Sequence, residues 1–102
     1  MNETDDKWYW LKEKAKSAFV NTSENYRQKI LYNLLNATKT GYQKRFFDIL
    51  LRALVANLED SKELAEKISE LQLQINNKDF EKFSYSIILG IMTSSKKQTG
   101  GN

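Results

Sequence analysis

Six basic side chains in the first half of the chain are the residues best suited to bind a charged ligand. Lysine and arginine neutralise the phosphates of nucleic acid and release the counterions condensed on them, which requires charge density but no fixed spacing. Each of the six lies outside the apolar stripe of its predicted helix. The candidate nucleic-acid contacts are Lys12, Lys16, Arg27, Lys44, Arg45 and Arg52.

The charge of the chain is unevenly distributed. The formal net charge is +3 at pH 7, but residues 7–52 hold ten basic and three acidic residues, an excess of seven positive charges. From residue 57 onward, six basic residues stand against seven acidic ones. The excess of positive charge in the first half of the chain favours a polyanion as the binding partner of that part of the molecule. The alternative is that these lysines and arginines are solvated surface residues that bind no ligand.

Histidine and cysteine are absent from the chain. Their absence removes thiolate nucleophiles, disulfides, zinc–thiolate sites and the usual general base of neutral-pH catalysis. The carboxylates Glu63, Glu66 and Glu70 have Lys62 and Lys67 nearby, which is typical of a solvated helix face. No glycine-rich phosphate loop or nucleophile motif occurs. We therefore expect a non-catalytic protein without a metal, a cofactor or a small-molecule substrate.

Aromatic and apolar residues at the two ends of the chain are candidates for protein contacts. Trp8, Tyr9 and Trp10 are consecutive, and at about 100° per residue a helix cannot turn all three inward. An exposed ring beside lysines stacks on a base or anchors an interface. The last helical segment is apolar on nearly every side, as in a central helix or one covered by another protein. The predicted protein-contact residues are Trp10, Ile88, Leu89 and Met92.

Helices joined by short polar loops must position these residues, because the chain has no proline and only four glycines. Asp60 and Glu63 have the spacing of a capping box, which predicts a helix from there to residue 75. A chain of 102 residues fits one domain. We expect an all-α fold, a small bundle of about five helices over residues 1–95, followed by a disordered tail over 96–102. Apolar periodicity predicts the other helices over residues 5–20, 24–39, 42–58 and 78–93.

A helix-turn-helix formed by the third and fourth helices is disfavoured, because its recognition helix would bring a net acidic surface to DNA. Sequence-specific binding is therefore not expected. Residues 1–6 are acidic where a secretory signal is basic, and the longest apolar run is too short to span a bilayer. With no cysteine for disulfides, these features predict a cytoplasmic protein without a membrane partner.

Two segments resemble proteins of CRISPR effector complexes of the Cascade type. The segment from Tyr42 to Leu51 (YQKRFFDILL) looks like a core helix of the small subunits. The segment from Phe83 to Gly90 (FSYSIILG) is similar to a closing helix with a Leu–Gly pair near the C-terminus of some type I large subunits. The resemblance implies a small subunit that assembles with further copies of itself and with other subunits of a ribonucleoprotein complex. It would bind the backbone of the displaced DNA strand, the guide RNA or the guide RNA–DNA hybrid without reading bases.

Two alternatives remain open from the residues alone. The chain could be a helical protein-interaction module, such as a phage or plasmid adaptor or an antitoxin-like partner, with its apolar last helix as the working surface. It could also be a small dimeric DNA-binding regulator. Binding to single-stranded DNA or RNA that weakens steeply with salt favours the nucleic-acid interpretation. Salt-insensitive association with a protein through Ile88, Leu89 and Met92 favours the adaptor.

Overall fold

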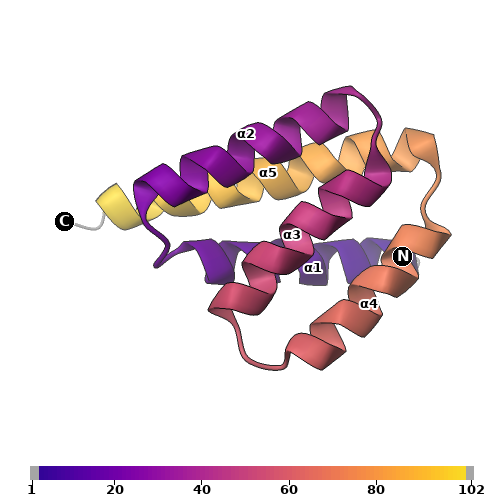
Figure 1. Cartoon of the computed structure of the whole chain (residues 1–102), viewed down its shortest axis with the longest axis horizontal. Helices are drawn as coiled ribbons and strands as arrows, with labels where there is room; N and C mark the ends of the chain where they lie inside the picture. The colour runs from indigo at the N-terminus through magenta and orange to yellow at the C-terminus, as the bar shows by residue number, and fades with distance from the viewer. Residues whose placement is uncertain (1–2, 101–102) are drawn as a thin grey trace.

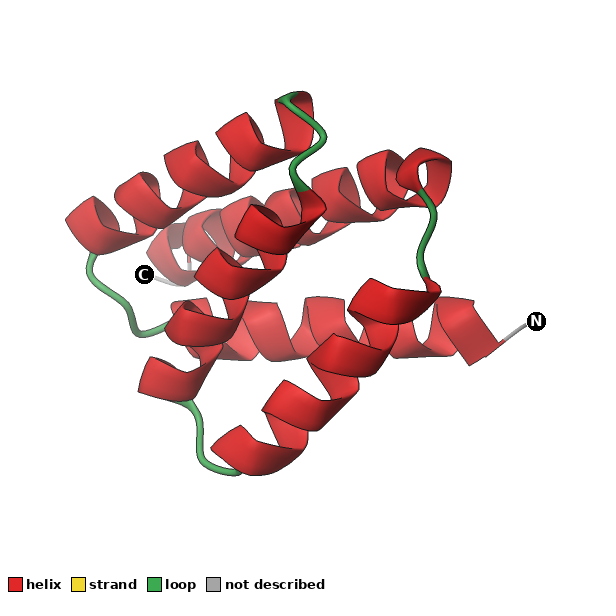
Figure 2. Ribbon diagram, turned by 45° about the vertical axis from the view of Figure 1, so that its right-hand side comes forward, coloured by secondary structure: helices red, strands yellow, loops and turns green. Residues whose placement is uncertain are grey.

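The computed structural model describes the backbone of residues 3–100 and the side chains of residues 6–94. The described residues form five α-helices and no strand, which confirms the predicted all-α bundle (Figures 1 and 2). The helices are α1 (Glu3–Phe19), α2 (Glu24–Lys39), α3 (Gln43–Asn57), α4 (Ser61–Gln74) and α5 (Asn77–Gly100).

Helix α3 lies at the centre of the arrangement and packs against α1, α2 and α4. The first and last helices, α1 and α5, lie side by side, and α3 crosses in front of them in Figure 1. Helix α2 covers the remaining side of α3 and also packs against α5. Since α3 has neighbours on three sides, only one stripe of its surface is left to face solvent.

The core is built from apolar stripes that follow helical spacing and meet at α3. An aromatic cluster joins α1, α3 and α5 at its centre. Trp8 stacks on Phe83 with ring centroids 4.8 Å apart. The ring of Phe47 lies 5.9 Å from Trp8, 5.7 Å from Phe46 and 6.1 Å from Phe80. These contacts fix the rotation of α3 about its axis, and with it the residues that α3 presents outward.

The end of α5 differs from the prediction. The helix continues to Gly100 and does not end at residue 93, so residues 96–100 of the segment predicted to be disordered have a helical backbone. The chain beyond Thr93 contains no proline, and its lysines and glutamine are good helix formers. Lysines near a helix C-terminus also interact favourably with the helix dipole. Residues 101 and 102 of the predicted tail lie outside the described residues.

The predicted capping box at the start of α4 is wrong. Asp60 has φ 51° and ψ 39°, in the left-handed region, and its side chain makes no capping hydrogen bond. A side-chain cap is found instead at α5, where Asn76 Oδ1 accepts from the Asp79 N–H at 2.8 Å. Asn76 Nδ2 also donates to the Asp79 carboxylate at 3.1 Å. The signal for this cap was an asparagine followed three residues later by an acidic residue.

We expect Asn76→Ala to lower the free energy of unfolding by about 1 kcal/mol, because the first turn of α5 loses its side-chain acceptor. The matched control is Asp60→Asn at the start of α4. Asparagine tolerates the left-handed conformation and no capping bond is lost, so this change should stay within about 0.5 kcal/mol of the wild type. Urea denaturation followed by circular dichroism measures both variants. No measurable loss in Asn76→Ala would show that the Asn76 cap adds no stability.

Candidate nucleic-acid interface

A groove between α2 and α3 brings together three of the six predicted basic residues. Its volume is about 520 Å³, and Lys44, Arg45 and Arg52 are exposed along its α3 wall. We call it the α2–α3 groove. It is lined by Tyr26, Ile30, Asn33, Tyr42, Lys44, Arg45, Asp48, Ile49 and Arg52.

The local sequence explains how the groove forms. Gly41 directly follows Thr40, the C-cap residue of α2. It has φ 70°, a left-handed conformation that favours glycine. The chain therefore turns at once, and α3 packs back against α2. Burial of Phe46, Phe47 and Leu50 turns the opposite face of α3 outward. Lys44, Asp48 and Arg52 share that outer face because they are spaced by four residues.

The positive charge of the groove is largely uncompensated. Among residues 6–94, Lys44, Arg45 and Arg52 form no ion pair with another side chain. Asp48 is the one carboxylate among the described lining residues. Lys44 and Arg45 lie in the first turn of α3, at the positive end of the helix dipole, and no acidic residue in that turn offsets their charge. A cation at this end is destabilising by about 0.3–1 kcal/mol. An anion bound in the groove would relieve this repulsion.

Lys12 and Lys16 lie on the seam between α1 and α5 and do not line the α2–α3 groove. Their aliphatic stems cross α5 at Gly90, where a Cβ atom would come within 3.0 Å of Lys12 Cγ and 3.5 Å of Lys16 Cγ. The Lys12 ammonium lies 5.6 Å from the centroid of the Tyr9 ring. The Lys16 ammonium lies 3.5 Å from the Glu13 carboxylate. The exposed predicted nucleic-acid contacts are therefore divided between two places, the α2–α3 groove and the seam between α1 and α5.

Arg27 is not a surface contact. Its side chain is buried, with 7% of the residue exposed, and its Nη1 donates to the Phe19 carbonyl at 2.8 Å. Phe19 ends α1, so the guanidinium satisfies a carbonyl at the negative end of that helix dipole. The spacing of Arg27 in the sequence indicated this burial. Arg27 lies four residues before Leu31 and seven before Leu34, and so falls on the inward stripe of α2.

The predicted protein-contact residues have three different environments. Trp10 is half-buried between α1 and α4, with the Lys67 ammonium 4.6 Å from its ring centroid. Ile88 was wrongly expected at the surface, since it is 6% exposed and belongs to the core. Leu89 and Met92 are exposed, and Tyr85 extends their stripe along α5. Three of the four therefore remain accessible to some degree.

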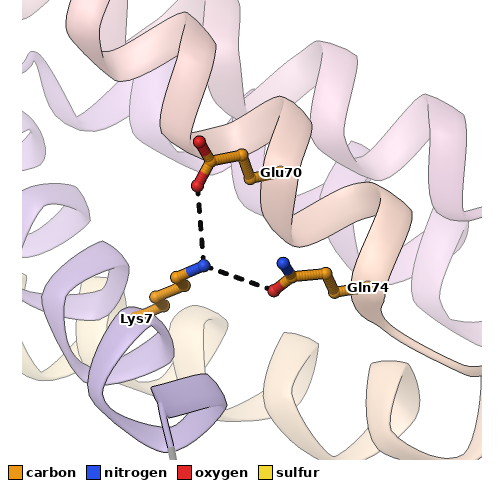
Figure 3. A network of polar contacts seen from close by, with 3 residues as sticks. All are labelled: Lys7, Glu70 and Gln74. Atoms are coloured by element: carbon orange, nitrogen blue, oxygen red, sulfur yellow. Dashed lines mark hydrogen bonds and ion pairs between the residues drawn. The ribbon is translucent and has the colours of Figure 1, made fainter.

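Lys7 shows how lysines outside the groove are used within the fold. Its ammonium lies 3.5 Å from the Glu70 carboxylate and 3.3 Å from Gln74 Oε1, and so bridges α1 to α4 (Figure 3). Lys67 likewise pairs with Glu63 at 3.3 Å. Such exposed pairs stabilise a protein little, but they compensate charge. The three basic residues of the α2–α3 groove differ from Lys7 and Lys67 in that they line one groove together without ion pairs among residues 6–94.

No protein-family model, curated protein or solved structure matches this chain. In the part of the chain that the structure describes, none of the helices has the length and apolarity needed to cross a membrane.

Proposed function

We propose that this protein binds the backbone of nucleic acid through the α2–α3 groove, without catalysing a reaction and without reading a base sequence. The observation that carries the proposal is the row formed by Lys44, Arg45 and Arg52, which have no ion pairs among the described residues. Cations on one wall of a groove attract a polyanion and release its counterions on binding.

The length of this row suits a chain of phosphates better than a single anion. Lys44 and Arg52 are eight residues apart on α3, which corresponds to about 12 Å along the helix axis. The axial spacing of phosphates on one strand of a B-DNA duplex is about 3.4 Å, and it is larger in an extended single strand. The row is therefore long enough for the three cations to contact more than one phosphate of the same strand.

The resemblance to Cascade small subunits concerns the same helix, since residues 42–51 lie almost entirely in α3. Under this proposal the ligand is the displaced DNA strand or the guide RNA–DNA hybrid in the cytoplasm. Leu89 and Met92, exposed on α5, would then face neighbouring subunits or further copies of the chain. Weak binding by one copy would be strengthened by many tethered contacts.

The adaptor alternative retains one observation in its favour, the exposed stripe of Tyr85, Leu89 and Met92 on α5. An apolar stripe of this kind is suited to a protein partner. Association through it would persist at salt concentrations that abolish binding to nucleic acid.

The salt dependence of binding tests the proposed function. Fluorescence anisotropy with a labelled strand of about 15 nucleotides, longer than one groove requires, measures the affinity of the full chain. Three phosphate contacts predict a slope of log K against log salt of about −2, or about a fifteenfold loss between about 50 and 200 mM salt. The proposal fails if no binding is measured at the lowest salt, or if affinity does not change with salt.

A further inference from the structure

We infer that Tyr26 and Tyr42 stack on unpaired bases, so that the α2–α3 groove selects a single strand over a duplex. The inference rests on the proposed function and adds a ligand class to it, nucleic acid whose bases are not covered by pairing. It depends on the aromatic residues of the groove and not on its charge.

The two tyrosines belong to the same groove as the three cations. Tyr26 comes from the first turn of α2, and Tyr42 occupies the N-cap position of α3 without a side-chain capping bond. Their exposed fractions are 41% and 57%. Among the described residues, neither ring pairs with another aromatic ring or with a cation. Each tyrosine is therefore partly exposed, and its ring is not already stacked on an aromatic ring or a cation of the described residues.

Their positions suit a strand laid along the groove. Because α2 and α3 are joined by the short turn at Gly41, Tyr42 lies at the turn end of the groove. Tyr26 is near the start of α2 and so belongs to the other end. Asp48 lies midway between Lys44 and Arg52 in sequence and repels phosphate, which directs phosphates toward the flanking cations. Bases splayed from such a strand can meet a tyrosine ring at either end.

Stacking, unlike charge, distinguishes a single strand from a duplex. The phosphates of both forms are open to lysine and arginine, and a duplex has the higher charge density, so the cations alone do not select a single strand. In a duplex each base face is covered by the neighbouring base pair, whereas a single strand can turn its bases onto aromatic rings. Stacking tolerates every base because each has a π face. The groove therefore prefers unpaired strands without preferring a sequence.

The test compares three ligands of equal length, a polydeoxyadenosine strand, a strand of abasic sites and a duplex, each bound by the full chain at one low salt concentration. We expect the adenosine strand to bind about tenfold more tightly than the abasic strand for each stacked base. Tyr26→Leu combined with Tyr42→Leu should remove this preference and leave affinity for the abasic strand unchanged.

Two control variants isolate the rings. Tyr26→Phe combined with Tyr42→Phe keeps the π faces and should keep the preference. Tyr32→Leu removes a tyrosine of α2 that is 73% exposed and does not line the groove, and it should bind all three ligands as the wild type does.

Equal affinity of the wild type for the adenosine and abasic strands overturns the inference without use of any variant. The inference is also overturned if the folded variant with Tyr26→Leu and Tyr42→Leu still prefers the adenosine strand to the abasic strand. In both cases the proposed function stands if the abasic strand binds with the expected salt dependence. If none of the three ligands binds, the proposed function and the inference fail together.

Discussion

Reversing Lys44, Arg45 and Arg52 to glutamate is expected to weaken binding to a short single strand by at least about a hundredfold at low salt, without unfolding the protein. Under the proposed function, each change removes a cation that would neutralise a phosphate and introduces a carboxylate that repels one. The remaining lining then carries four carboxylates and no cation, counting Asp48. The slope of log K against log salt should fall toward zero together with the affinity.

Stability should not follow the loss of binding. At positions 44 and 45, glutamate lies in the first turn of α3, where a carboxylate favours the helix dipole by about 0.3–1 kcal/mol. New repulsion of Asp48 by residues 44 and 52, each four positions away, offsets this gain by about 0.2–0.5 kcal/mol per pair. The free energy of unfolding should therefore stay within about 1 kcal/mol of the wild type by urea denaturation.

A second triple reversal controls for the net charge. Lys29, Lys62 and Lys78 are exposed, do not line the α2–α3 groove, and change the charge of the protein equally when replaced by glutamate. Lys62 and Lys78 also lie in the first turns of their helices, so the effect on helix dipoles is comparable. This control should keep most of the affinity. An equal loss in both variants would mean that binding is spread over the surface and that the groove assignment is wrong.

Phe47→Ala is expected to lower the free energy of unfolding by about 3–5 kcal/mol. Phe47 is 1% exposed, and its ring contacts Trp8 of α1, Phe46 of α3 and Phe80 of α5. Alanine would leave a cavity among these helices in addition to the lost apolar burial. Small domains have total stabilities of about 5–15 kcal/mol, so the variant should be partly unfolded at elevated temperature.

Two further variants define the expected scale. Phe47→Leu refills most of the space and should lose much less stability than Phe47→Ala. Tyr32→Ala removes an exposed ring without packing partners in the aromatic cluster, and should change the free energy of unfolding by less than about 0.5 kcal/mol. Urea denaturation followed by circular dichroism compares all three. Similar losses for Phe47→Ala and Tyr32→Ala would contradict the central place of Phe47 in the core.

The success of the helix predictions has a local physical cause. Apolar spacing of three and four residues, the turn at Gly41 and the absence of proline act within one or two helical turns. The bounds of α2 agree with the predicted range 24–39, and α3 differs from its predicted range by one residue at each end. The two wrong predictions arose where two local preferences compete. At Asp60, an aspartate suited to cap a helix can also adopt the left-handed conformation. At the end of α5, a polar segment without proline can also be helical.

The sequence by itself therefore determined the fold class, most of the helix bounds and the excess of positive charge in residues 7–52. Only the tertiary structure decided which of these charges lie together. Lys44, Arg45 and Arg52 line one groove, Lys12 and Lys16 cross α5, and Arg27 caps a carbonyl of α1. The reason is that a helix has several outward directions, and packing against other helices determines which of them reach solvent. The same packing placed Tyr26 and Tyr42, which are distant in sequence, in the groove with the three cations.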